Sequence, residues 1–149
     1  MKTLLIVSHT PSANTRQLTE WVAAGEGEAS VELKLSEPLK TGPQQVLAAD
    51  GLILGTTENF GYMSGAMKDF FDRIYYSCLE ETRGLPYALF IRAGQDGQGA
   101  KTSIERIVTG LGWRAVQEPL ICKGEITHFQ ESCVQLGQLM ALGLEQEIF

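Results

Sequence analysis

Hydroxyl and amide side chains crowd the segment that follows the first apolar run of the chain. This segment, Ser8-His9-Thr10-Pro11-Ser12-Ala13-Asn14-Thr15, leads into a stretch with helical spacing that begins near Asn14. The start of a helix offers unpaired N–H groups and the positive end of a dipole, and both favour an anion. The four hydroxyl groups add neutral donors. The segment therefore predicts a site for a phosphate monoester, although Ser and Thr are also favoured at an ordinary helix start. His9 is expected to face solvent.

Two further segments combine glycines with groups that suit a flat ring. Residues 56–64 contain Gly61, and residues 92–99 contain three glycines within their last six positions. The apolar side chains of the first of these segments are Phe60, Tyr62 and Met63. They can stack on a ring or pack beneath the loop. We expect Gly61 and Gly94 to let the backbone approach such a ring closely.

An alternation of strand-like and helix-like stretches must position these segments. Apolar or alternating runs predict strands at residues 3–8, 31–36, 51–56, 87–92 and 114–122. Helical spacing predicts helices at residues 14–24, 43–49, 64–79, 99–111 and 125–144. Strands separated by helices indicate right-handed βαβ units and a parallel sheet.

The kind of each strand predicts its place in the sheet. Continuous apolar runs at 3–8, 51–56 and 87–92 indicate central strands, because such strands are buried on both faces. The alternating run and the run that contains Pro119 suit the edges. The result is an α/β fold, a flavodoxin-like three-layer sandwich with a five-stranded parallel sheet of order 2-1-3-4-5, formed by one domain over residues 1–149. A Rossmann dinucleotide domain would need G-x-G-x-x-G after the first strand, and residues 8–15 contain no glycine.

With these elements in place, a family resemblance becomes visible. Residues 6–15 resemble the phosphate loop of flavodoxins and related NAD(P)H-dependent FMN or quinone reductases. Residues 49–56 and the motif Gly61-Tyr62-Met63-Ser64-Gly65-Ala66-Met67-Lys68-Asp69-Phe70-Phe71-Asp72-Arg73 resemble their third strand, flavin loop and following helix. The resemblance covers essentially the whole chain. It implies non-covalent FMN, with the phosphate at residues 10–15 and the ring between the second and third loops. The cofactor-binding residues expected on this basis are Thr10, Ser12, Ala13, Asn14, Thr15, Thr57, Glu58, Asn59, Phe60, Gly61, Tyr62, Ala93, Gly94, Gln95 and Gly97.

The chain departs from the family pattern at two loops and one strand. Ala13 stands where the family usually has glycine, and the third loop lacks the aromatic residue that covers the flavin in electron-carrier flavodoxins. The last strand lacks the long insertion of long-chain flavodoxins. The missing aromatic favours an enzyme over a carrier, whereas Ala13 indicates an altered phosphate loop or weaker FMN binding.

Three functions are compatible with these residues. The leading hypothesis is an oxidoreductase whose FMN takes a hydride from NAD(P)H and reduces a quinone, a flavin or a similar acceptor. Because the cofactor supplies the chemistry, no catalytic acid or base is expected. The alternatives are a one-electron carrier of the flavodoxin type with a redox partner protein, and an interaction module that has lost its cofactor.

The composition limits which partners, cross-links and cellular location are expected. A net charge of −6 does not favour nucleic acid as a partner. The three cysteines are scattered, so neither a disulfide framework nor a metal site is expected. No apolar stretch is long enough for a membrane span, and we expect a cytoplasmic protein. The sequence leaves a homodimer open.

Overall fold

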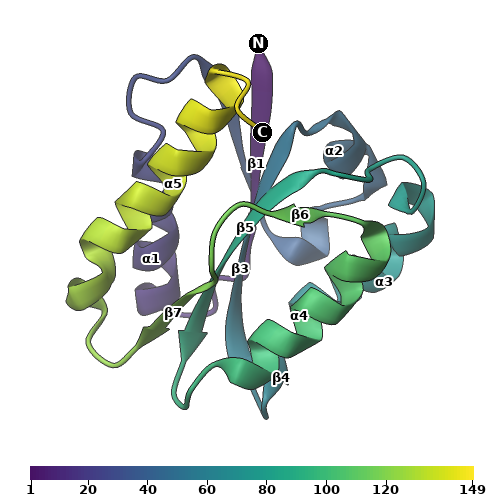
Figure 1. Ribbon diagram of the computed structural model, residues 1–149. Coiled ribbons are helices and arrows are strands. Elements are labelled where there is room, and N and C mark those ends of the chain that lie inside the picture. Colours follow the sequence, from purple (N-terminus) through teal and green to yellow (C-terminus); the bar gives the residue numbers. More distant parts are fainter.

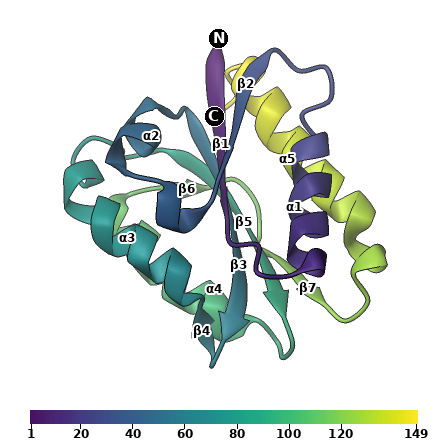
Figure 2. The same ribbon diagram turned by 180° about the vertical axis from the view of Figure 1, so that it is seen from behind.

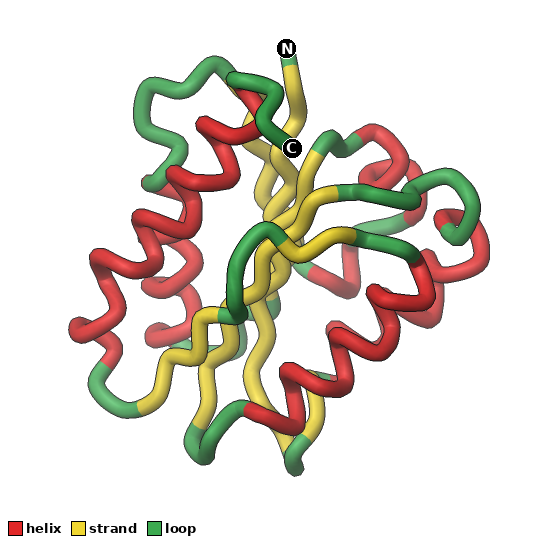
Figure 3. The backbone as a smooth tube through the Cα atoms, viewed as in Figure 1, coloured by secondary structure: helices red, strands yellow, loops and turns green.

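A computed structural model describes residues 1–149, and its elements follow the expected alternation closely. In chain order the elements are β1 (Lys2–Ser8), α1 (Ala13–Ala24), β2 (Val31–Ser36), the 3₁₀ helix η1 (Pro38–Lys40), α2 (Pro43–Ala48), β3 (Gly51–Asn59), β4 (Tyr62–Met63), α3 (Gly65–Cys78), β5 (Pro86–Ala93), α4 (Gln98–Leu111), β6 (Arg114–Ala115), β7 (Leu120–Lys123), the 3₁₀ helix η2 (Ile126–Phe129) and α5 (Gln130–Glu145). The elements form three layers, with α1 and α5 on one face of the sheet and α2, α3 and α4 on the other (Figures 1 and 3).

The central strands have the predicted order. The path through the sheet is β2-β1-β3-β5-β6, and the neighbours along it are parallel. The predicted fold class is confirmed, but the sheet has seven strands where five were expected.

One extra strand comes from division of the predicted fifth strand. Both β6 and β7 pair with β5, and residues 116–119 between them stand opposite only Ala88 and Leu89. Pro119 has no N–H to donate to the ladder, so pairing stops before it and resumes at Leu120. The expectation of one continuous strand over residues 114–122 was therefore wrong.

The other extra strand comes from a segment that was expected to be a loop. β3 continues to Asn59 and pairs antiparallel with β4 through a turn whose central residues are Phe60 and Gly61. Both residues have positive φ, 54° and 69°, as a type I′ hairpin turn requires. Residues 58–63 thus form a β-hairpin, and the positive φ of Gly61 is sufficient to explain a glycine there.

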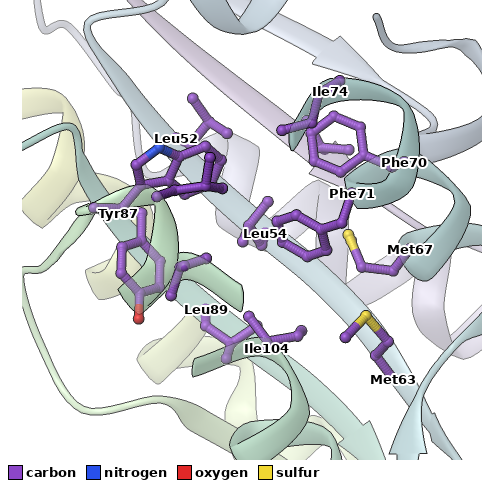
Figure 4. Packing of buried hydrophobic residues seen from close by; sticks show 14 of the residues in the cluster. Leu52, Leu54, Met63, Met67, Phe70, Phe71, Ile74, Tyr87, Leu89 and Ile104 are labelled. Atoms are coloured by element: carbon purple, nitrogen blue, oxygen red, sulfur yellow. The ribbon is translucent and has the colours of Figure 1, made fainter. Parts of the chain in front are cut away.

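Two cores fill the spaces on either side of the sheet. The larger lies beneath α2, α3 and α4 and contains the aromatic rings of Phe70 and Phe71, whose centroids are 5.2 Å apart (Figure 4). The smaller lies beneath α1 and α5. Cys78 belongs to the first core, and Cys122 and Cys133 belong to the second. All three cysteines are free and buried. These cores hold both helical layers against strands whose carboxyl ends lie at one end of the molecule.

Candidate functional site

The three loops singled out in the sequence meet at one end of the sheet. They follow β1, β3 and β5, which are adjacent and parallel, so their carboxyl ends share one edge. In Figure 2 this edge is the lower end of the molecule, where the chain leaves β1 for α1 and where the β3–β4 hairpin projects. The termini lie at the opposite end. In doubly wound folds this carboxyl edge is where ligands bind.

The first loop ends in a reciprocal capping arrangement at α1. The backbone N–H of Thr15 donates to Ser12 Oγ at 3.2 Å, and the backbone N–H of Ser12 donates to Thr15 Oγ1 at 3.0 Å. Two of the hydroxyls expected at a phosphate therefore also serve as helix caps. Thr15 is buried, whereas Ser12 is exposed.

Free donors remain on the exposed first turn of α1. Ala13 and Asn14 are exposed, and their backbone N–H groups have no hydrogen-bond partner within the chain. The Ala13 side chain points outward and fills no part of the core. The donor set at this terminus consists of backbone amides and the Asn14 side chain, which suits an anion such as a phosphate.

The rest of the first loop is partly withdrawn from solvent. Ser8 is buried and its hydroxyl lies 2.8 Å from Thr19 Oγ1. Thr10 is half-buried and lines a small hollow with Glu37 and Leu35. His9 does not face solvent freely as expected, because its Nδ1 atom is buried. Burial lowers the pKa of His9, and the charge of Glu37 opposes that shift.

Two buried polar atoms at this edge have no hydrogen-bond partner. They are Thr57 Oγ1 and His9 Nδ1. Thr56 hydrogen-bonds to Ser64 N on the α3 side, and side chains alternate along a strand, so Thr57 points to the face of α1. A buried hydroxyl without a partner costs about 1–3 kcal/mol. A ligand that lies over β3 and reaches the start of α1 would satisfy Thr57.

The Glu58 carboxylate is hydrogen-bonded to the start of α4. Its carboxylate accepts hydrogen bonds from Gly97 N at 3.2 Å, Gly99 N at 3.1 Å and Ala100 N at 3.2 Å. These are the first amides of α4, so Glu58 caps that helix from across the hairpin. This contact is not visible in the sequence, because residue 58 and residues 97–100 are distant along the chain and meet only in the folded structure.

The hairpin presents an aromatic side chain at its tip. Asn59 and Gly61 are exposed, Tyr62 is 41% exposed and Phe60 is fully exposed. Phe60 holds the left-handed conformation, which is uncommon for a bulky residue and costs about 1–2 kcal/mol. Met63, for which both stacking on a ring and packing beneath the loop were open, is buried in the core.

The third loop is open. Ala93 is buried at the end of β5, whereas Gly94, Gln95 and Asp96 are exposed. A Cβ atom on Gly94 would meet nothing within 4 Å. Gly97 is buried in the left-handed conformation, with a φ of 73°. No aromatic residue stands in this loop, so one side of the space beside the hairpin stays uncovered.

The chain has neither a cluster of metal-ligating side chains nor a helix that could span a membrane. No three His, Cys, Asp or Glu side chains are grouped so as to hold a metal ion. None of the helices has the length and apolar character needed to cross a membrane.

Known proteins place this geometry in a family. The family described as NADPH-dependent FMN reductase matches residues 34–124. A flavodoxin of Aquifex aeolicus (strain VF5) is 31% identical over 112 residues, which are 74% of this chain and 60% of the relative. The chain thus spans about three fifths of the length of that curated relative.

Solved structures agree with the fold. A flavodoxin from the domain Archaea superposes with a TM-score of 0.79 at 20% identity, covering 97% of this chain and 99% of the other. The apo form of an NADH:FMN oxidoreductase superposes with a TM-score of 0.72 at 14% identity, covering 95% and 90%. A carrier and a reductase therefore share this fold, and the fold alone does not separate the two functions.

These comparisons support an FMN-binding flavoprotein. Because the family model matches more than half of the chain and the fold agrees with it, this chain belongs to the NADPH-dependent FMN reductase family, within the flavodoxin-like superfamily.

Proposed function

We propose that the chain binds FMN non-covalently and uses it to pass electrons from NAD(P)H to a quinone, a flavin or a similar acceptor. The observation that carries the cofactor site is the buried, unpartnered hydroxyl of Thr57, which lies between two sets of exposed donors. On one side are the free amides of Ala13 and Asn14, which suit the phosphate. On the other are Gly94 and Gln95, which suit the polar edge of the ring.

The residues of the chain position the cofactor and leave it accessible. When bound, FMN supplies a flavin ring that accepts a hydride from a nicotinamide and passes electrons on. The β3–β4 hairpin is tied to α4 through Glu58, so Phe60 is held on a braced support beside the ring position. The open loop at Gly94–Asp96 leaves one face for a nicotinamide to approach.

A one-electron carrier is the second candidate, and Phe60 favours it. An aromatic side chain that projects fully from a braced hairpin can cover a ring face. The curated relative is also named a flavodoxin. If Phe60 covers the face that the third loop leaves open, a nicotinamide cannot stack there.

Anaerobic mixing separates the two candidates. FMN-loaded protein is mixed with NADPH or NADH, and flavin absorbance is followed against free FMN at the same concentration. We expect bleaching faster than that of free FMN. Absence of bleaching over many minutes, together with a stable one-electron-reduced flavin on stepwise chemical reduction, would establish the carrier.

A further inference from the structure

A cationic hollow lies on the α3–α4 side of the hairpin, and two of its lining residues, Gly61 and Tyr62, were also expected beside the flavin ring. Its volume is about 490 Å³, and it is bounded by the hairpin turn, the start of α3 and one face of α4. Its lining residues are Gly61, Tyr62, Lys68, Gln98, Gly99, Thr102, Ser103, Arg106 and Ile107. The first turn of α1, where the phosphate of FMN is proposed to bind, lies on the opposite face of the sheet (Figure 1).

The charge of the hollow is opposite to that of the whole chain. The protein has a net charge of −6, yet two cations and no carboxylate line this space. Lys68 is oriented by Asp72, whose Oδ1 lies 2.7 Å from Lys68 Nζ, and it keeps two further N–H donors. Arg106 has no ion pair or hydrogen bond within the chain. The hollow therefore carries uncompensated positive charge at Arg106.

The neutral groups of the hollow are also arranged along one line. Gln98, Thr102 and Arg106 follow one another at four-residue intervals on α4, so they share a face about 12 Å long. The side chains of Gln98 and Thr102 make no hydrogen bond within the chain, and it is the backbone N–H of Gln98, not its side chain, that donates to Asp96 Oδ1 at 3.1 Å. Ser103, in contrast, already bonds to Ala100 O and Met63 N. The row on α4 is a set of free donors that ends at the guanidinium group.

Apolar surface completes the hollow. Tyr62 is 41% exposed, so part of its ring borders the space, and Ile107 is half-buried against the larger core. Cationic donors beside a partly exposed aromatic ring match a ligand that is itself anionic and flat. We propose that this hollow binds a small aromatic anion, with its carboxylate or phosphate on Arg106 and Lys68 and its ring against Tyr62 and Ile107.

Phenyl phosphate is a suitable probe for this site. It is titrated into the ¹⁵N-labelled full-length chain, with and without saturating FMN, and amide shifts are followed by NMR. We expect saturable shifts centred on Gly61, Gly99, Ser103 and Arg106 that persist in the presence of FMN. Inorganic phosphate and phenol, which each lack one half of the probe, should bind more weakly.

Two matched variants test the charge. Arg106→Gln should weaken phenyl phosphate binding roughly tenfold, because it removes a charge-assisted pair. Lys101→Gln removes a charge from the same helix but not from the hollow, and it should change the affinity by less than about twofold. Circular dichroism should show both variants folded.

Several results would overturn the proposal. Shifts centred on residues 10–15, or their loss when FMN is added, would mean that the probe binds at the start of α1. Equal weakening by Arg106→Gln and Lys101→Gln would mean general screening by surface charge. Inorganic phosphate binding as tightly as phenyl phosphate would exclude a role for the ring. Shifts that do not saturate would mean that the hollow is no binding site and that its side chains are only solvated.

Discussion

At Ser12 two functions meet in one side chain. Its hydroxyl caps α1, and its position at the exposed first turn places it beside the proposed phosphate. Asp and Asn both cap helices about as well as Ser does, so both substitutions preserve the cap. They differ in charge alone, which makes them a matched pair for separating cap from cofactor.

We expect Ser12→Asp to weaken FMN binding at least tenfold, which is about 1.4 kcal/mol. The added carboxylate would repel the phosphate, while Ser12→Asn should keep most of the affinity. Fluorescence titration of FMN measures both constants, and urea unfolding of the apo proteins checks that the cap survives. Equal affinity for the Asp and Asn variants would place the phosphate away from this helix start.

Burial shields all three cysteine thiols from reagents in solution. Cys78, Cys122 and Cys133 are each 0% exposed. Burial raises the pKa of the Cys78 thiol, and the pKa of Cys122 is raised by its hydrogen bond with Cys133 together with burial. Thiolate, the reactive form, is therefore scarce at Cys78 and Cys122 near neutral pH.

We expect native protein near pH 8 to release almost no colour with a thiol-specific disulfide reagent, and full reaction after unfolding. Comparison with denatured protein supplies the control, because all three thiols are then free to react. Fast reaction of one equivalent in the native state would reveal an opening motion around one of the three sites.

At the residue scale, the sequence predicts which residue types gather at the site but not which hydrogen bonds their side chains form. The hydroxyls of Ser12 and Thr15 were expected at the first loop, and the structure places them there, already hydrogen-bonded to each other's backbone. Glu58 was expected near the ring, and it caps a helix some forty residues away. Hydrogen-bond partners distant in sequence arise only when the sheet forms, so local composition cannot reveal them.

At the scale of elements, Gly94 is the better probe of backbone approach than Gly61. Gly61 has a φ of 69°, so any side chain there strains the turn whether or not a ligand binds. Gly94 has a φ outside that left-handed range and open space around a Cβ atom. A larger side chain at Gly94 is thus free of structural conflict in the apo protein.

We expect Gly94→Val to weaken FMN binding severalfold while changing apo stability by less than about 0.5 kcal/mol. The side chain would occupy space that the ring edge needs. Titration with FMN and urea unfolding give the two numbers. Unchanged affinity with a large loss of stability would make this glycine purely structural.

The two helices that cover the smaller core touch through glycines. A Cβ atom on Gly137 of α5 would collide with the carbonyl oxygen of Val22 in α1. The same collision would arise from the other side, since a Cβ atom on Gly25 would meet Val134 O. The helices can approach this closely only because both positions lack a side chain.

Gly137→Ala should lower the free energy of unfolding by about 1–3 kcal/mol, as expected when a packed contact is overfilled. Gly65→Ala is the matched control, because Gly65 begins α3 and a Cβ atom there would meet nothing within 4 Å. That control should leave stability unchanged or slightly higher. Similar losses for both variants would mean that the α1–α5 crossing can yield.

Over the whole molecule, the strand order was predictable because burial leaves a mark on every strand. The runs at Leu4–Val7 and Leu52–Leu54 are continuous because helices cover both faces of the sheet there. The division of the fifth strand and the β3–β4 hairpin were not predicted. Both features depend on which strands pair. The turn was also hard to recognise in the sequence, because Phe60 stands at a position where type I′ turns favour glycine or asparagine.

The stability of the whole fold at high pH depends on the buried phenol of Tyr87. This residue of β5 is 4% exposed, and its ring centroid lies 6.2 Å from that of Trp113. Burial, with a smaller effect of the Glu105 charge, raises the pKa of Tyr87 from 10.0 to about 12. The folded state therefore holds the phenolic proton more tightly than the unfolded chain does.

The sign of the effect follows from that difference. The stability that neutral Tyr87 contributes is fully present below pH 10.0 and is lost as pH rises through about 12. Tyr87→Phe removes the ionisable phenol, so the variant should lose less stability than the parent between about pH 10 and pH 12 in urea unfolding. Tyr76→Phe removes a phenol that is 84% exposed and should follow the parent. If the stability of Tyr87→Phe falls as steeply with rising pH as that of Tyr76→Phe, a group other than Tyr87 governs the loss of stability in alkali. Water would then reach the Tyr87 phenolate in the core beside β5.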